Sequence, residues 1–273
     1  MPLNIALIGY GEVGQLFARE FVRKGRAAVT VYDLKFDNAA SRAPLAKIAA
    51  EDDVRLEESS AAAVTGADIA ISAVTADQAV AAARAAAPYL KAGQLYVDLN
   101  SISPTTKRRV AEAIAPSGAD FVEFAVMSPV AGLGIASPVL AGGERAAELA
   151  NRLNPFGMEI DAVTPEIGVV SATKLCRSIV IKGLEAIMVD FNLAADKAGV
   201  KAAVLKSLTA SYPGMDWAEV ARVMPTRVAR HGVRRAAEMR EAARMLEEMG
   251  LSGAFPNAIA ERHQRYAGDK REH

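Results

Sequence analysis

The fold of this chain is decided by residues 3–14, LNIALIGYGEVG, in which an apolar run leads into three glycines spaced G-x-G-x-x-G. The apolar run predicts a buried strand, and the QLFAREFVRKG that follows predicts an amphipathic helix ending at Gly25. Residues 29–33, VTVYD, predict a second strand, which places Asp33 about 20 positions beyond the last glycine. A glycine-rich turn between a strand and a helix, followed by such an acid, indicates a dinucleotide-binding unit.

Each position of this turn requires glycine for a different physical reason. Gly9 permits the tight turn, Gly11 lets the backbone approach a pyrophosphate, and Gly14 lets the helix pack closely on the strand. The helix N-terminus then offers unpaired N–H groups and the positive end of its dipole to the phosphates. Asp33 would accept hydrogen bonds from the adenosine ribose and repel a 2′-phosphate, which favours NAD, whereas the neighbouring Lys35 leaves NADP open. The alternative interpretation is a glycine turn that binds no ligand.

Strands and helices continue to alternate after this unit. Residues 68–74 and 94–99 predict strands, residues 77–90 predict a helix, and another helix begins at Pro104. This alternation is typical of a parallel sheet with helices on both faces.

Polar residues follow two of these predicted strands. In a doubly wound sheet, ligands bind outside the carboxyl ends of the strands, and Val74-Thr75 and Asn100-Ser101 occupy such ends. Thr75 is a candidate for contacting the cofactor and Ser101 for binding the substrate; either could instead be a helix N-cap or a turn residue. The predicted cofactor-binding residues are Gly9, Tyr10, Gly11, Glu12, Val13, Gly14, Asp33, Val74, Thr75 and Asn100.

A long helix is predicted over residues 167–198, which at about 1.5 Å per residue would span roughly 45 Å. Most of its surface is apolar, yet Lys174, Ser178 and Lys182 follow one another at four-residue intervals and therefore share a face. A solvated edge would explain this polar stripe. The nucleotide-binding signal that precedes it favours the wall of a pocket instead.

Helices continue after Gly199, over about 201–210, 216–223 and 226–249, with a last one after Pro256. The third is rich in arginine, and a carboxylate or phosphate could use one or two of these guanidinium groups. We name Arg234 and Arg235 first, with His231 one turn before them. The interleaved glutamates favour a solvated, salt-bridged face as the alternative.

Composition limits the other possibilities. Lys+Arg and Asp+Glu both number 32 among 273 residues, which gives no electrostatic case for nucleic acid or an anionic membrane surface. The single cysteine, Cys176, excludes an intrachain disulfide and indicates a reducing compartment; we expect it to be packed in the core. Three scattered histidines predict no metal site, and the apolar runs are too short to span a bilayer. The amino-terminal residues lack a secretion signal, so we expect a cytoplasmic protein.

Three motifs, in order, resemble those of the β-hydroxyacid dehydrogenase family, which includes 3-hydroxyisobutyrate and 6-phosphogluconate dehydrogenases. Beyond the glycine fingerprint, residues 98–104 (DLNSISP) resemble the family's D-x-S-T-I-x-P loop, and residues 128–133 (SPVAGL) its A-P-V-S-G-G loop. Residues 168–178 resemble its G-x-G-x-x-x-K-x-x-x-N motif, which implies that Lys174 is the catalytic lysine. The resemblance covers roughly residues 3–199.

The chain departs from the family pattern at several positions, which indicates a divergent subgroup. The loop serine and second glycine are Ala131 and Leu133, and the asparagine after the lysine is Ser178. The family's late lysine–aspartate pair has its best counterpart in Ala237-Glu238.

The resemblance implies an NAD(P)-dependent oxidoreductase that transfers hydride between nicotinamide and a small β-hydroxyacid, with Lys174 as general acid and base. In a partly desolvated apolar wall the pKa of an amine is lowered, so the neutral amine can act as a base. The substrate-binding residues so implied are Ser101, Ala131, Gly132, Leu133, Ser178 and Lys182. An imine reductase, or a dinucleotide-binding sensor without activity, remains an alternative.

For the architecture, we expect a Rossmann-type domain over residues 1–163 and an all-helical substrate and dimerisation domain over 164–273, joined through the long helix. The resemblance also implies a homodimer or homotetramer. The apolar surface of the long helix favours this independently, because the residues that follow can cover it only in part.

Overall fold

The structure, a computed structural model, describes residues 3–24, 27–130 and 132–269 and divides into two compact units, Met1–Lys174 and Leu175–His273. The division falls inside one helix, α7 (Val169–Ala198), which is the long helix predicted from the sequence. The predicted boundary between residues 163 and 164 lies just before this helix. Each unit is described below by itself.

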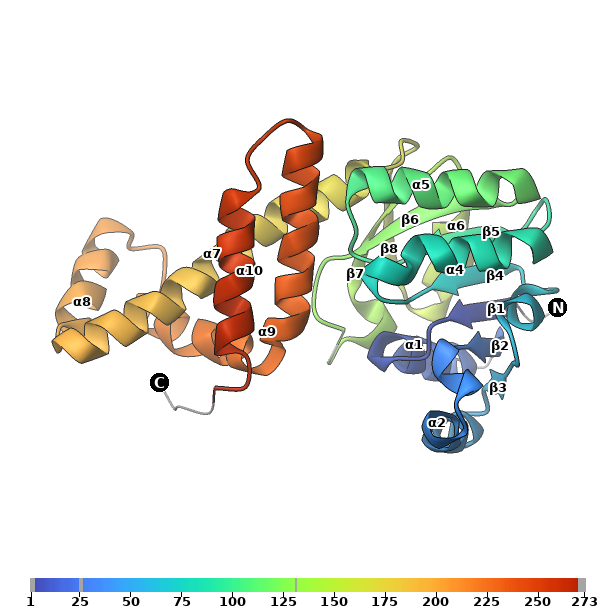
Figure 1. The fold of residues 1–273 in the computed structure, drawn as a ribbon, viewed down its shortest axis with the longest axis horizontal. Coiled ribbons are helices and arrows are strands. Elements are labelled where there is room, and N and C mark those ends of the chain that lie inside the picture. Colours follow the sequence, from blue (N-terminus) through green and yellow to red (C-terminus); the bar gives the residue numbers. More distant parts are fainter. Residues whose placement is uncertain (1–2, 25–26, 131, 270–273) are drawn as a thin grey trace. The chain divides into compact units, whose positions relative to one another are not determined.

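The first unit is built on an eight-stranded, mostly parallel sheet with the strand order β3-β2-β1-β4-β5-β6-β7-β8 (Figure 1). The reversal of strand order beside β1 is the point at which ligands bind in doubly wound sheets. The strands are β1 (Leu3–Ile8), β2 (Ala27–Tyr32), β3 (Arg55–Leu56), β4 (Ile69–Ser72), β5 (Leu95–Asp98), β6 (Asp120–Val126), β7 (Pro138–Gly142) and β8 (Glu159–Thr164).

Both faces of the sheet are covered, as the alternation of elements predicts. Successive side chains of β1 enter different hydrophobic clusters, Ile5 and Leu7 on one face and Ala6 and Ile8 on the other, because a strand points alternate residues to opposite sides. The helices of this unit are α1 (Glu12–Arg23), α2 (Ala39–Glu51), α3 (Ser60–Val64), α4 (Ala79–Ala86), α5 (Pro104–Ile114) and α6 (Ala146–Leu153).

The sheet is not wholly parallel, which the sequence did not lead us to expect. β7 runs antiparallel to β6, and β8 then runs parallel to β7. Among its described residues, the connection between β6 and β7 contains one short 3-10 turn, Gly134–Ala136, and no crossover helix. A parallel neighbour needs such a crossover, so this short connection forces the antiparallel pairing.

The second unit is helical and consists of the rest of α7 with α8 (Lys201–Ser211), α9 (Trp217–Glu248) and α10 (Ala254–Tyr266). Our expectation of two separate helices over 216–223 and 226–249 is wrong, because α9 is continuous through Pro225. A proline in a helix leaves the carbonyl four residues earlier without its N–H partner. The side-chain amide of Asn192 on α7 donates to that carbonyl, Ala221 O, at 2.6 Å, and so supplies the missing donor.

Two further findings concern surfaces. Cys176 is exposed in the described chain, so our expectation that it packs in the core is wrong; it lies two positions from Lys174 and therefore on another side of α7. No helix in the ranges described above combines the length and the apolar character needed to cross a membrane.

Candidate functional site

The glycine turn between β1 and α1 leaves room for a ligand at one position only. Gly9 has φ +101°, and a Cβ there would lie 2.3 Å from the carbonyl oxygen of Ala73; a Cβ on Gly14 would lie 2.1 Å from Gly9 O. Both glycines are therefore required by packing of the protein against itself. A Cβ on Gly11, the residue that caps α1, would meet nothing within 4 Å. The open side of the turn thus faces the N-terminus of α1, where a phosphate fits.

Among the neighbouring predicted residues, Tyr10 contributes its backbone only. Its side chain is fully buried and packs edge-on against Phe36, with ring centroids 6.2 Å apart. Burial raises the pKa of the Tyr10 phenol to about 12, and Asp52 nearby adds to this shift. Glu12 is exposed and Val13 half-buried in the first turn of α1. The predicted cofactor contacts here are therefore backbone groups at a helix N-terminus.

Asp33 joins the glycine turn to the end of β2. Its Oδ2 accepts a hydrogen bond from Tyr10 N at 2.7 Å, and its Oδ1 accepts one from Lys35 N at 2.9 Å. The side chain is half-buried, and each carboxylate oxygen keeps a second lone pair. Asp33 can therefore hold the turn in place and still accept from a ribose hydroxyl.

Level with the carboxyl ends of β4 and β5, side chains form a row that continues across β6 and β7. Ser72, Asp98, Glu123 and Gly142 are successive register partners on β4, β5, β6 and β7, and we call them the polar row. The three that carry side chains beyond Cα are completely buried. Buried polar groups need partners, so the partners of this row decide what it can do.

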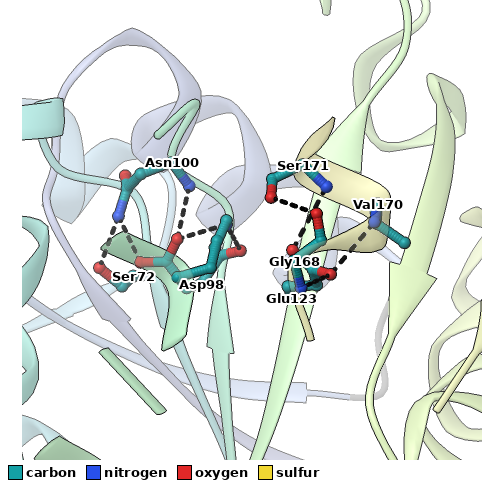
Figure 2. A network of polar contacts seen from close by, with 8 residues as sticks. Ser72, Asp98, Asn100, Glu123, Gly168, Val170 and Ser171 are labelled. Atoms are coloured by element: carbon teal, nitrogen blue, oxygen red, sulfur yellow. Dashed lines mark hydrogen bonds and ion pairs between the residues drawn. The ribbon is translucent and has the colours of Figure 1, made fainter. Parts of the chain in front are cut away.

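One end of the polar row holds Asn100, a predicted cofactor residue (Figure 2). Asn100 Nδ2 donates to Ser72 Oγ at 3.1 Å and to Asp98 Oδ2 at 2.6 Å, and Asn100 N donates to Asp98 Oδ1 at 3.2 Å. Both amide hydrogens are thus used inside the protein, and Asn100 keeps only its carbonyl oxygen to offer a ligand. The ammonium of Lys107 on α5, fully buried, bonds Asp98 O at 2.7 Å and Oδ1 at 2.5 Å.

The other end of the row holds the start of α7 (Figure 2). Glu123 Oε1 accepts from Gly168 N at 2.7 Å and from Val170 N at 3.2 Å, and its Oε2 accepts from Ser171 N at 3.3 Å. A strand carboxylate therefore satisfies the first N–H groups of α7, which no residue inside the helix can do. Lys174, half-buried, comes one turn after Ser171 and belongs to the same compact unit as the sheet.

The remaining predicted cofactor and substrate residues of this unit lie on loops. Ser101 is half-buried after β5, and Val74 and Thr75 follow β4, with Thr75 exposed. Gly132, at φ +99°, and Leu133 are exposed between β6 and β7. Ala131 lies outside the described residues.

In the helical unit, Ser178 and Lys182 are both buried and bind one carboxylate. Glu238 Oε1 on α9 accepts from Ser178 Oγ at 2.5 Å and from Lys182 Nζ at 3.0 Å, and Lys182 Nζ also donates to Ser178 Oγ at 3.1 Å. The hydroxyl hydrogen of Ser178 is therefore given to Glu238. Glu238, which the resemblance matches to a cofactor-binding pair, lies in this cluster.

A second buried pair lies beside it. Arg235 donates from one nitrogen to both oxygens of Glu185, at 2.8 and 2.6 Å, and Glu185 is completely buried. Burial raises the pKa of Glu185, and the cations Arg235, Lys182 and Arg227 oppose this shift. Arg235 is thus engaged inside the protein, whereas Arg234 and His231 are exposed.

His263 on α10 completes what we call the helical ion cluster, which consists of Ser178, Lys182, Glu185, Arg235, Glu238 and His263. The ring is fully buried, and its Nε2 lies 3.0 Å from the carbonyl oxygen of Lys182. Burial first, and then the charges of Arg235 and Lys182, lower the pKa of His263 to about 4, against the hydrogen bond to that carbonyl and the charge of Glu238. The ring is therefore neutral near pH 7.

Sequence reasoning missed Lys107 and Glu123 as site residues. Each is a charged residue at a buried position: Glu123 interrupts the apolar strand FVEFAV, and Lys107 lies on the buried face of α5. A charged side chain at a core position is a signal for a buried partner, but it does not identify that partner, which is nine residues away for Lys107 and 45 residues away for Glu123.

Comparison with known proteins supports this reading of the sheet unit. Residues 4–161 match the family described as the NAD binding domain of 6-phosphogluconate dehydrogenase. Residues 195–266 match a domain of unknown function (DUF1932).

The solved structures that are similar over nearly the whole chain include the following three. A conserved hypothetical protein from Sinorhizobium meliloti 1021 is 38% identical, with a TM-score of 0.82, covering 97% of this chain and 88% of that one. Conserved protein MTH1747, of unknown function and described as structurally similar to 3-hydroxyacid dehydrogenases, is 29% identical, with a TM-score of 0.78 over 97% and 96%. 3-Hydroxyisobutyrate dehydrogenase from Mycobacterium tuberculosis, solved with L-serine, is 20% identical, with a TM-score of 0.79 over 98% and 95%.

The last of these similarities shows the shared fold alone, as does that of an imine reductase from Streptomyces aurantiacus, which is 22% identical with a TM-score of 0.61 over 96% and 93%. The family match covers more than half of the chain and agrees with the glycine turn, the strand order and the long helix. The chain therefore belongs to the β-hydroxyacid dehydrogenase family, with a nucleotide-binding domain of the 6-phosphogluconate dehydrogenase type.

Proposed function

We propose that this protein is an NAD(P)-dependent dehydrogenase of a small β-hydroxyacid, or of its keto or semialdehyde form, with Lys174 as general acid and base. The observation that carries the proposal is the start of α7. Glu123 on β6 lies level with the carboxyl ends of β4 and β5 and holds the first turn of α7, and Lys174 follows within the same compact unit as the glycine turn. The bound nicotinamide would supply the hydride chemistry.

The residues of the chain supply binding and the proton. The N–H groups at the start of α1 would bind the pyrophosphate, and Asp33 would accept from the ribose. In the oxidative direction the neutral amine of Lys174 takes the proton of the substrate hydroxyl; in the reductive direction its ammonium returns that proton to the carbonyl oxygen. We assign the substrate carboxylate to Ser101 and to backbone groups around Gly132 and Leu133.

In the helical unit, fewer hydrogen-bonding groups of Ser178 and Lys182 remain for the substrate than the family pattern implies. Glu238 already accepts from both Ser178 and Lys182. If these residues contact the substrate, Ser178 would offer a lone pair and no hydrogen, because its hydrogen is given to Glu238. This favours a substrate group that donates a hydrogen bond at this position.

The test of the function is turnover on a panel of β-hydroxyacids, their aldehydes and keto acids, and cyclic imines, each with NAD(H) and NADP(H). We expect turnover of a hydroxyacid, and Lys174→Ala should lower it at least about 100-fold while cofactor affinity survives. Lys197→Ala, in the last turn of the same helix, is the matched control and should keep full activity. An active Lys174→Ala enzyme would exclude the assigned role, and turnover of imines alone would favour the imine reductase alternative.

We further propose NAD as the preferred cofactor, with Asp33 as the residue that selects it. Asp33→Ser keeps a capping oxygen for the backbone but removes the negative charge that repels a 2′-phosphate. The ratio of kcat/KM for NAD over NADP should therefore fall about tenfold or more, whereas Asp37→Ser, on the exposed turn nearby, should leave it unchanged. An unmoved ratio in Asp33→Ser would remove Asp33 from this role.

Finally, we propose that the protein is a homodimer or homotetramer. Val180 and Ile187 on α7 and Phe255 on α10 are 68%, 53% and 59% exposed, and a second copy of the chain would cover such apolar side chains. Light scattering that gives the mass of one chain would contradict this proposal.

A further inference from the structure

One buried acid takes no part in the proposed reaction. Among the described residues, it is the sole side chain that the structure shows bonded to the backbone N–H groups of Gly168, Val170 and Ser171. This acid is Glu123, at the centre of β6, with 0% of its surface exposed. A charge taken out of water at this depth is costly unless it is bonded. Its three N–H partners and the positive end of the helix dipole balance that cost.

We propose that Glu123 is a positioning residue for Lys174: it fixes the first turn of α7 to the sheet and thereby sets where the lysine amine stands. This inference rests on the proposed function of Lys174. The three bonded N–H groups span the first turn of the helix, and Lys174 comes three residues after the last of them. A movement of this turn therefore moves the lysine with it, because the helix backbone is stiff over so short a distance.

The surroundings of Glu123 hold the carboxylate in one place. A Cβ on its register partner Gly142 would lie 3.0 Å from Glu123 Oε1 and 3.1 Å from Val170 Cγ2. The glycine therefore leaves just the room that the carboxylate and the helix need. Ser171 Oγ also donates to Gly168 O at 3.0 Å, which closes the turn that Glu123 caps.

The polar row also positions Asn100, a predicted cofactor residue. Asp98, the register partner of Glu123 on β5, bonds Asn100 through both oxygens. The two adjacent carboxylates use different partners: a lysine and an amide for Asp98, a helix N-terminus for Glu123. One level of the sheet thus fixes both a predicted cofactor residue and the helix that carries the lysine, and a misplacement of about 1 Å in such a site can lower the rate about 100-fold.

The test is a graded series at Glu123 with a second probe at Gly142. Glu123→Gln keeps the oxygen that accepts from Gly168 and Val170 and loses the bond to Ser171, whereas Glu123→Ala loses all three. We expect turnover to fall a few-fold in Glu123→Gln and more than tenfold in Glu123→Ala, with KM for the nicotinamide cofactor within about twofold of wild type. Gly142→Ala, which pushes on the same junction, should show the same loss of kcat.

To separate positioning of Lys174 from a merely structural role, Glu123→Ala is made both in the wild type and in Lys174→Ala. Glu123→Ala should cause no further loss in the residual turnover of Lys174→Ala, because its effect passes through that lysine. An equal loss in both backgrounds would overturn the proposal. Asp216→Ala, which removes the carboxylate that caps α9, is the control and should lower stability without this pattern.

Hydrogen exchange gives a readout that needs no substrate. Amides of residues 168–174 should exchange at least about tenfold faster in Glu123→Ala than in wild type, while those of β1 keep their rates. Unchanged exchange there would overturn the anchoring of α7 even if turnover falls. Lack of turnover in the wild type on the whole panel, or full activity of Lys174→Ala, would instead contradict the proposed function, so the two failures are distinguishable.

Discussion

Glu123 in the polar row and Glu185 in the helical ion cluster are both completely buried carboxylates, but they are satisfied in different ways. Glu123 in the row accepts from backbone N–H groups, whereas Glu185 in the cluster is bonded by the guanidinium of Arg235. Backbone partners are fixed by the fold itself, and side-chain partners each require their own ordering. Glu123 therefore transmits position to a helix, whereas Glu185 and Arg235 mainly balance each other's charge.

The largest effect that tests this comparison is expected on breaking the Glu185–Arg235 pair. Arg235→Leu would leave a buried carboxylate without its cation, which costs about 3–5 kcal/mol of unfolding free energy in such pairs. Chemical denaturation should show this loss. Arg234→Leu, at the next and exposed position, is the matched control and should change stability by less than about 0.5 kcal/mol. Equal effects of the two changes would contradict the assigned balance of charge.

The second effect is the pH dependence of the cluster. In the unfolded chain His263 binds a proton below about pH 6.5, but in the folded protein only below about 4, so unfolding takes up a proton between these values and stability falls as the pH drops. At pH 5 this group alone should cost about 2 kcal/mol relative to pH 7. The raised pKa of Glu185 acts with the opposite sign, because the folded protein then binds a proton where the unfolded chain does not.

The measurement is the denaturation midpoint of wild type and His263→Gln at pH 7 and pH 5. Glutamine can still donate to the carbonyl of Lys182 but does not titrate, so its stability should fall less between the two pH values. A variant with the same loss as wild type would show that the acid sensitivity lies elsewhere.

The smallest effect is expected at the glycine turn and separates packing from ligand binding. Gly11→Ala adds a methyl group in open space, so the fold should remain stable, but cofactor affinity should fall about tenfold, or about 1.4 kcal/mol. Gly9→Ala places its methyl group against Ala73 O at φ +101° and should lower the melting temperature itself. The measurements are titration of both variants with NADH and their thermal unfolding, which separate ligand binding from packing. Full NADH affinity in Gly11→Ala would show that no phosphate approaches there.

Much of the fold was predictable because local signals carry it. The strand–turn–helix of residues 3–23, the strands at 69–72 and 95–98, and the helix α7 follow from apolar periodicity and from glycines at positions with a special conformation. The short β3 and the strand β8 have weaker local patterns, whereas the residues of β7 (PVLAG) are strand-like and only its antiparallel direction was not predicted. The family resemblance is confirmed by the match of residues 4–161.

The candidate site was predictable in its motifs but less so in its partners. The sequence placed Lys174, Ser178 and Lys182 on one helix face, but it could not show that Glu238, 60 residues after Ser178, bonds the latter two. It also gave no reason to couple Asp98 to Lys107, or Glu123 to the start of α7. Such pairs depend on which buried groups meet across elements, and an isolated position carries no mark of its partner.

By itself, the sequence determined a nucleotide-binding sheet entered through a glycine turn, followed by a long helix that carries Lys174. These features depend on backbone conformation and hydrophobic periodicity, which are properties of neighbouring residues. Tertiary structure alone decided that α9 runs on through Pro225, because Asn192 on another helix supplies the missing donor. It alone decided that Glu123 caps α7, because the register of β6 brings that carboxylate to the first turn of the helix.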